Sequence, residues 1–145
     1  MGIDTKELQT LTKKLNILFV EDDAIVRKLT HQILDVFFKD LTVTENGQEG
    51  LDAYKHSLDE NQENFDIVIT DVSMPKLSGI EMAQQILEMN PHQHFIFLSA
   101  HQDNDYAKEL NDKGYFTSTT KPITLDSLKL VFQQSCLQLQ DKGLV

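Results

Sequence analysis

Side chains with a chemistry of their own follow four short apolar segments of the sequence. In chain order they are Glu21 and Asp22, Asp71, Ser99, and Lys121. Two bare carboxylates about 4 Å apart repel each other by roughly 4 kcal/mol at an effective dielectric constant near 20. If the three acids meet at one place, they therefore need a cation, and an all-oxygen ligand set favours a hard ion that keeps its water, such as Mg²⁺.

The serine and the lysine are suited to binding an anion beside such a cation. Lysine is a good point-charge partner for phosphate, and Ser99 could hold a second phosphoryl oxygen. A cation site and an anion site with a carboxylate between them can move a phosphoryl group onto that carboxylate. In this scheme Asp71 attacks in line, while Mg²⁺ and Lys121 offset charge on the transferring oxygens.

Each of these residues also has an ordinary structural role open to it. Asp22 and Asp23 could cap the following helix, and we expect capping for Asp23. Asp71 could be a turn residue, Ser99 a simple strand end, and Lys121 a solvated surface residue. The combination is harder to explain in this way, because the strand ends carry an acid pair, an acid, a hydroxyl and a lysine in that order.

The elements that must position these residues alternate between β-type and helical patterns. We predict strands at 15–20, 41–45, 65–70, 94–99 and 115–120, with helical segments between and after them. The first, third and fourth strands are apolar throughout, which is typical of parallel strands covered on both faces. Right-handed crossovers then give a doubly wound α/β fold: a five-stranded parallel sheet with helices on both faces.

Capping signals mark two helix starts, Asn46 with Glu49 and Ser78 with Glu81. The helix predicted at 24–38 has one apolar face, which consists of Ile25, Leu29, Ile33, Val36 and Phe37. We predict a polar loop at 57–64. A short helix at 103–114 and a last helix capped by Thr124 complete the pattern.

The length of 145 residues suits one domain with a substantial core. We expect a helical extension at 1–14, the domain at 15–140 and a tail at 141–145. The 13 basic and 23 acidic residues give a net charge of −10, which argues against direct binding of nucleic acid or of an anionic membrane surface.

Targeting and redox signals are few. No apolar run approaches the roughly 18 residues of a membrane span, and the amino terminus lacks a signal-peptide core. The single Cys136 excludes a disulfide framework within the chain, so we expect the cytoplasm.

Five short motifs together resemble one known family. They are ILFVEDD (17–23), ENGQEGL (45–51), FDIVITDVSMPKLSGIE (65–81), IFLSA (96–100) and TKP (120–122). With these motifs the chain resembles the receiver domain of two-component response regulators over about residues 15 to 140. The resemblance implies the flavodoxin-like strand order 2-1-3-4-5.

The resemblance also implies a role for each site residue. Asp71 would be the phosphoacceptor, served by a phosphohistidine on a sensor histidine kinase or a histidine phosphotransfer protein. Mg²⁺ would be held by Asp22, Asp71, the backbone carbonyl of Ser73 and, through water, Glu21. In the same scheme the switch hydroxyl is Ser99, and Lys121 pairs with the phosphoryl group.

Further expectations come from the same resemblance. The chain would not be an enzyme in the usual sense, although Mg²⁺-dependent self-phosphorylation and self-dephosphorylation are expected. A downstream effector and a homodimer through the fourth helix, fifth strand and fifth helix are the other partners it suggests. The family commonly has an aromatic residue where this chain has Ser118, and His101 reads as a solvated loop residue or as one lying over the phosphoryl group.

Two other functional classes stay open at this point. One is a constitutive interaction domain with a receiver fold that takes no phosphate, favoured by Ser118. The other is an enzyme of similar fold, such as a flavin-binding protein or a haloacid-dehalogenase-like phosphohydrolase. The loop after the first strand is acidic, whereas flavin phosphate binding wants a loop rich in Ser, Thr and Gly.

Overall fold

The computed structural model describes residues 6, 9–10, 13, 15–61, 65–72, 74, 77–99, 116–120, 126 and 130, and of 60–61, 99 and 116–120 the backbone only. Five parallel strands form one sheet in the order β2-β1-β3-β4-β5. The strands are β1 (Asn16–Val20), β2 (Asp40–Thr44), β3 (Ile67–Asp71), β4 (His94–Ser99) and β5 (Phe116–Thr120). The predicted doubly wound fold and its strand order are confirmed.

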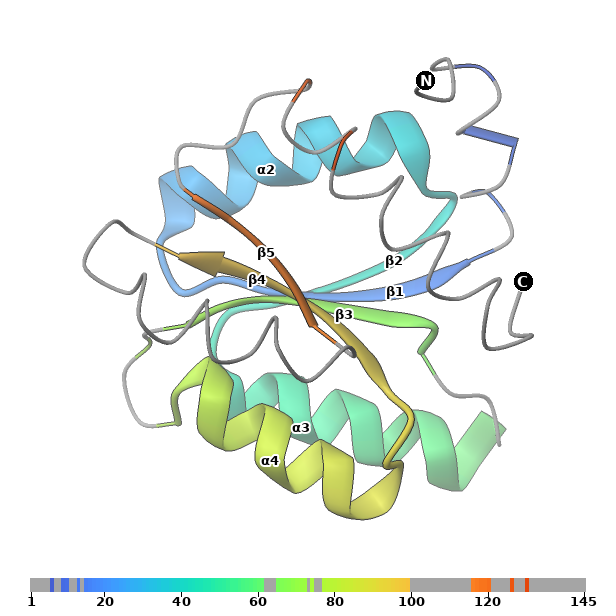
Figure 1. Cartoon of the computed structure of the whole chain (residues 1–145), viewed down its shortest axis with the longest axis vertical. Helices are drawn as coiled ribbons and strands as arrows, with labels where there is room; N and C mark the ends of the chain where they lie inside the picture. The colour runs from blue at the N-terminus through green and yellow to red at the C-terminus, as the bar shows by residue number, and fades with distance from the viewer. Residues whose placement is uncertain are drawn as a thin grey trace.

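Among the residues that the structure describes, three helices cover the two faces of this sheet (Figure 1). One face carries α2 (Ala24–Phe37), and the other carries α3 (Gly47–His56) and α4 (Gly79–Met89). The helices predicted at 103–114 and after Thr124 fall outside the described residues, apart from residues 126 and 130. Within the part of the chain that the structure describes, no helix has the length and hydropathy needed to cross a membrane.

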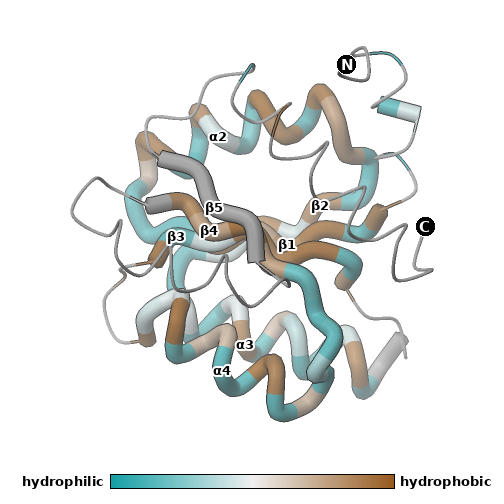
Figure 2. Tube along the Cα trace, in the orientation of Figure 1, coloured by the Kyte–Doolittle hydropathy of each residue, from teal (hydrophilic) through white to brown (hydrophobic). Residues whose placement is uncertain are grey.

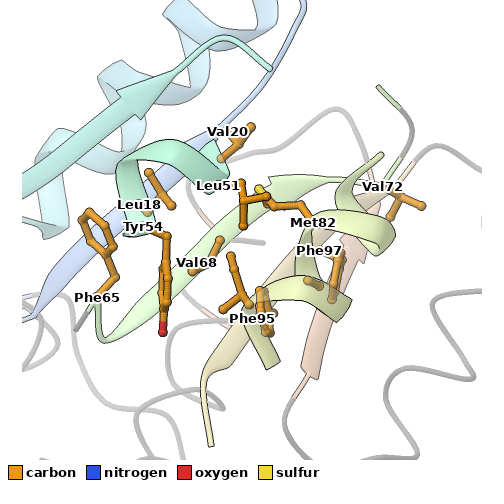
Figure 3. Packing of buried hydrophobic residues seen from close by; sticks show 12 residues of the cluster. Leu18, Val20, Leu51, Tyr54, Phe65, Val68, Val72, Met82, Phe95 and Phe97 are labelled. Carbon is orange, nitrogen blue, oxygen red and sulfur yellow. The ribbon is translucent and has the colours of Figure 1, made fainter. Parts of the chain in front are cut away.

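The central strands are buried on both sides, and their side chains alternate between two cores. Figure 2 shows apolar residues running along β1 and β4. The core beneath α2 contains Leu15, Ile17, Phe19, Leu34, Phe37, Phe38, Ile67, Ile69, Ile96 and Leu98. The core beneath α3 and α4, shown in Figure 3, contains Leu18, Val20, Leu51, Tyr54, Phe65, Val68, Val72, Met82, Ala83, Ile86, Phe95 and Phe97. This two-sided burial makes the sheet a rigid support for the carboxyl ends of its strands. We call this side of the sheet, where the strands end, its carboxyl edge.

The apolar face predicted for α2 was largely wrong. Ile25, Leu29 and Val36 are 73%, 56% and 40% exposed. The residues that α2 buries are Thr30, Leu34 and Phe37. Helical periodicity fits either of two adjacent stripes of α2. The stripe that packs against the core contains the polar Thr30, so it does not look apolar in the sequence. Ile33 lies between the two stripes and packs partly against the core.

The polar loop predicted at 57–64 was wrong for its first part. A π-helical turn, η1 (Ser57–Asn61), continues directly from α3. Ser57 is buried, and the partly buried Leu58 packs against the core beneath α3 and α4. Packing of Ser57 and Leu58 therefore accompanies one more helical turn than the polar composition of this segment suggests.

The helix caps predicted at Asn46 and Ser78 are present. Asn46 Oδ1 accepts a hydrogen bond from Glu49 N at 2.8 Å. Ser78 Oγ accepts from Glu81 N at 3.1 Å, while Ser78 N donates to Glu81 Oε1 at 3.3 Å. These caps start α3 and α4 directly after the loops at the carboxyl edge of the sheet, and so fix where those loops end.

Candidate functional site

Three acidic side chains meet at the carboxyl edge of the sheet. Asp71 is the last residue of β3, and Glu21 and Asp22 directly follow β1. The two strands are parallel neighbours, with Val20 paired to Thr70, so their ends lie side by side. One carboxylate oxygen from each of the three acids lies within 4.8 Å of the others.

Burial makes this cluster costly without a counter-ion. Glu21 is 0% exposed and Asp71 is 7% exposed, whereas Asp22 reaches solvent. A buried carboxylate loses hydration, and like charges nearby add repulsion. An ion entering from the side of Asp22 would offset both costs.

The donor set fits Mg²⁺ in its chemistry and spacing. All three side chains offer carboxylate oxygens, the hard ligands that this ion prefers. Opposite ligands of an octahedral Mg²⁺ are about 4.2 Å apart, because each lies about 2.1 Å from the ion. The three oxygens lie within 4.8 Å of one another, so one ion can be reached by all three, directly or through bound water.

The acidic loop is fixed by hydrogen bonds on both sides of Glu21. Its backbone N–H donates to Thr44 O at 3.3 Å, which joins the loop to the end of β2. Its Oε2 accepts from Asp23 N at 3.4 Å. Asp23 Oδ1 in turn accepts from the backbone N–H groups of Ile25 and Val26 at 2.9 and 3.0 Å, so the capping role predicted for Asp23 is confirmed.

The backbone around Asp71 is fixed as firmly. Val72 N donates to Leu98 O at 3.2 Å and continues the ladder between β3 and β4 one residue further. Gly79 N donates to Val72 O at 2.9 Å and closes the loop onto α4. A Cβ atom at Gly79 would overlap the carbonyl oxygen of Asp71, so only glycine allows this close approach.

The remaining predicted site residues are placed by backbone or lie outside the described residues. Ser99 ends β4 one residue beyond Leu98, the partner of Asp71, and it pairs with Thr120 at the end of β5. The ends of β4 and β5 therefore reach the same edge as Asp71. The side chain of Ser99, and the whole of Ser73, Ala100, His101 and Lys121, are outside the described residues.

Sequence reasoning missed Arg27, which lies in the first turn of α2. Its Nη1 donates to the backbone carbonyls of Glu21 at 3.0 Å and Asp22 at 3.4 Å. Its Nη2 lies 3.6 Å from Oε1 of Glu45, the residue that follows β2. An arginine four residues after the helix cap Asp23 was the available signal, since that spacing lets the side chain fold back over the loop.

Comparison with known proteins identifies the family. The sequence model of the response regulator receiver domain matches residues 17–133. A cyclic di-GMP phosphodiesterase of Thermotoga maritima is 30% identical over 116 residues, which cover 80% of this chain and 29% of that protein. The two-component response regulator ARR12 of Arabidopsis thaliana is 31% identical over 130 residues, which cover 89% of this chain and 21% of that protein. The chain therefore spans less than a third of either relative.

Solved structures agree with this assignment. A response regulator receiver domain protein from Clostridium thermocellum matches with a TM-score of 0.75 and 28% identity, covering 90% of this chain and 99% of that one. In the co-crystal of the Saccharomyces cerevisiae phosphotransfer protein Ypd1 with the receiver domain of Ssk1, a chain matches with a TM-score of 0.69 and 23% identity, covering 86% and 90% of the two chains; at that identity the likeness shows the fold alone. From its sequence match, its sheet order and the acids gathered at the sheet edge, the chain belongs to the receiver domain family of two-component response regulators.

Proposed function

We propose that Asp71 accepts a phosphoryl group from a phosphohistidine on a partner protein, with Mg²⁺ held by Glu21, Asp22, Asp71 and the backbone carbonyl of Ser73. One observation carries this proposal. In a chain of the receiver family, oxygens of Glu21, Asp22 and Asp71 lie within 4.8 Å of one another at the sheet edge. Such an arrangement of acids is costly unless it binds a cation, and a cation there can neutralise a phosphoryl group.

In the proposed reaction a carboxylate oxygen of Asp71 attacks phosphorus in line. The new bond joins that oxygen to phosphorus, the bond from phosphorus to the donor imidazole nitrogen breaks, and the imidazole keeps the electron pair and takes up a proton. The hydrogen bonds that fix the backbone at Val72 and Gly79 hold the attacking carboxylate in position before the donor arrives.

The charge of the transferring oxygens is offset by groups at the same edge. Mg²⁺, when bound, supplies Lewis-acid stabilisation of that charge. We assign the ammonium of Lys121 to one phosphoryl oxygen and the hydroxyl of Ser99 to another. The parallel register supports this, because Ser99 and Thr120, the residue before Lys121, end neighbouring strands at this edge.

The partner would be a sensor histidine kinase or a histidine phosphotransfer protein. The solved structure of the Ssk1 receiver domain with the phosphotransfer protein Ypd1 supports that class. In this chain Ile25 and Leu29, 73% and 56% exposed, lie on α2 directly after the acidic loop and would be covered by such a partner. We further propose a downstream effector and a cytoplasmic location. We also propose a homodimer through β5 and the helices predicted at 103–114 and after Thr124.

We propose a signalling phosphoacceptor with self-phosphorylation and self-dephosphorylation, and not a phosphodiesterase. The similarity to the Thermotoga maritima phosphodiesterase covers only 29% of that protein. Its named activity is therefore not carried over to this chain.

The test is incubation of the chain with Mg²⁺ and acetyl phosphate, followed by intact-mass analysis. The wild type should gain one phosphoryl group, Asp71→Asn should gain none, and chelation of Mg²⁺ by EDTA should prevent the gain. The matched control is Asp40→Asn, because Asp40 is an exposed acid at the opposite end of a strand and its change should have no effect.

Two results would contradict the proposal. A phosphoryl group on Asp71→Asn would move the acceptor elsewhere. A wild type that gains no phosphoryl group from acetyl phosphate would favour the constitutive interaction domain.

A further inference from the structure

Arg27 links three parts of the carboxyl edge. Its backbone belongs to α2, its Nη1 donates to the carbonyls of Glu21 at 3.0 Å and Asp22 at 3.4 Å, and its Nη2 lies 3.6 Å from Glu45 just after β2. The side chain is only 20% exposed, so these contacts are largely shielded from water. One guanidinium thus connects α2, the acidic loop and the segment that follows β2.

The contacts act on the backbone of the acidic pair and not on its carboxylates. Nη1 binds two neutral carbonyl oxygens, and the carboxylate beside Nη2 is that of Glu45, which is outside the cluster. Arg27 therefore does not neutralise the carboxylates of the acidic pair by direct contact.

Fixing these carbonyls fixes where the acids point. Glu21 is now held at its N–H by Thr44 and at its carbonyl by Arg27. The carbonyl of Asp22 is held as well, so the two peptide groups that set the directions of both side chains cannot rotate freely. If the dihedral angles of this loop were not fixed in advance, ion binding would have to order them and would cost conformational entropy.

We propose that Arg27 is a positioning residue of the metal site, which holds the backbone of Glu21 and Asp22 so that both carboxylates meet Asp71. Glu45 keeps the guanidinium in place at its outer side. The inference rests on the proposed Mg²⁺ site and adds a residue to it that is not a ligand. Partners that orient metal ligands without touching the metal typically contribute about 10- to 100-fold to affinity.

The sign of the effect separates positioning from charge. If Arg27 acted only as a nearby cation, it would repel Mg²⁺, and its removal would tighten metal binding. If it positions the ligands, its removal weakens binding in spite of the lost repulsion.

The experiment measures Mg²⁺ affinity of the full chain by isothermal titration calorimetry for the wild type, Arg27→Ala and Arg27→Lys. We expect Arg27→Ala to bind about tenfold more weakly. Arg27→Lys should fall between the two, because an ammonium keeps the charge but lacks the planar fork that places Nη1 on the carbonyls and Nη2 against Glu45. In phosphorylation by acetyl phosphate, Arg27→Ala should need more Mg²⁺ for half-maximal rate and reach the wild-type rate at saturation.

Two controls separate charge and outer contact from positioning. Lys28→Ala removes the same charge from the neighbouring, exposed position on α2, and should leave Mg²⁺ affinity unchanged or slightly tighter. Glu45→Gln removes an ion-pair partner that is itself 65% exposed, so affinity should fall by no more than about threefold.

Each outcome decides the matter. Equal or tighter binding by Arg27→Ala overturns the inference, as does a rate that stays low at saturating Mg²⁺. If Arg27→Ala does not fold, Arg27→Lys carries the test, because weaker binding at unchanged charge supports positioning and unchanged binding overturns it. A wild type that binds no Mg²⁺ overturns the proposed function itself, a result distinct from a wild type that binds and an Arg27 variant that binds equally.

Discussion

The amino ends of the strands, here called the amino edge, and the carboxyl edge of the sheet differ in how their polar residues are arranged. At the amino edge, Tyr54 Oη donates to Gln93 Oε1 at 2.7 Å and accepts from Asn90 Nδ2 at 3.2 Å. Gln93 Nε2 donates to Asp66 O at 3.3 Å, and Asp66 Oδ2 accepts from Asn16 N at 2.7 Å. Each of these donors meets an acceptor, so the network stabilises the fold.

At the carboxyl edge, three like-charged acceptors are gathered within 4.8 Å. The same sheet therefore joins its polar residues in hydrogen bonds at one end of its strands and gathers like charges at the other. A gathering of like charges is a departure from local complementarity, and such departures are typical of functional sites.

Removing Tyr54 tests the amino edge with the largest expected effect. Tyr54 is 0% exposed, so Tyr54→Ala should lower the free energy of unfolding by about 4 kcal/mol, measured by urea denaturation. Protein that stays folded should still take a phosphoryl group at Asp71 from acetyl phosphate. Loss of phosphorylation in folded Tyr54→Ala would show that the two edges are not independent.

Crowding the carboxyl edge should cost slightly less. Gly79→Ala places a Cβ atom against the carbonyl oxygen of Asp71, and backbone must move to admit it, so we expect a loss of about 3 kcal/mol in thermal or urea unfolding. In Gly50→Ala the Cβ would meet side-chain atoms of Val20 and Met82 at 2.7 and 2.8 Å. Because the Met82 side chain can move, this control should lose less. Equal losses would argue that the Asp71 backbone is not rigidly held.

An Asp→Asn substitution should change the free energy of unfolding in opposite directions at the two edges. Without Mg²⁺, Asp71→Asn removes one of three repelling charges and should raise the free energy of unfolding by about 1 to 2 kcal/mol. Asp66→Asn weakens the acceptor of Asn16 N and should lower it by about 1 kcal/mol. Urea denaturation in EDTA measures both. A destabilised Asp71→Asn protein would remove the distinction between the edges.

Alkaline pH gives the smallest effect and again concerns the amino edge. Burial raises the pKa of Tyr54 above its ordinary value of 10.0, although the hydrogen bond with Asn90 acts in the opposite direction. Because the unfolded chain loses this proton first, the stabilisation is complete below pH 10 and is lost as pH rises through the higher folded-state pKa.

The comparison with Tyr54→Phe isolates that titration. This variant should be less stable by about 1 kcal/mol at pH 8, since Gln93 loses its donor. The difference from the wild type should shrink above pH 10. Parallel pH profiles for the two proteins would exclude Tyr54 as the titrating group.

Much of the fold follows from local patterns. Apolar runs bounded by turn residues predicted the strands, and 94–99 matches β4 at both ends. Asn46 and Ser78 announced helix starts because a cap needs only a side chain three residues from its partner. The buried face of α2 could not be predicted, since two neighbouring apolar stripes compete and only the tertiary packing of Leu34 and Phe37 decides.

The site divides in a similar way. The gathering of Glu21, Asp22 and Asp71 follows from strand ends and parallel topology, which sequence shows. The contacts of Arg27 depend on a side chain that folds back onto carbonyls and on the position of Glu45, which follows β2. In the sequence the spacing of Arg27 from the helix cap Asp23 allows these contacts, but ordinary charged residues on helix surfaces share that spacing, so it does not single out this arginine.

The hydrogen bond from Val72 N–H to Leu98 O has a consequence for signalling. It anchors the main chain on the far side of Asp71, at 3.2 Å, so the acidic side chain is mounted on a support secured before and after it. A group attached to this carboxylate cannot be accommodated by bending the strand. The structure must therefore adjust to the added charge through changes of side-chain rotamers and of the connecting segments, and these changes can reach a surface that a partner binds.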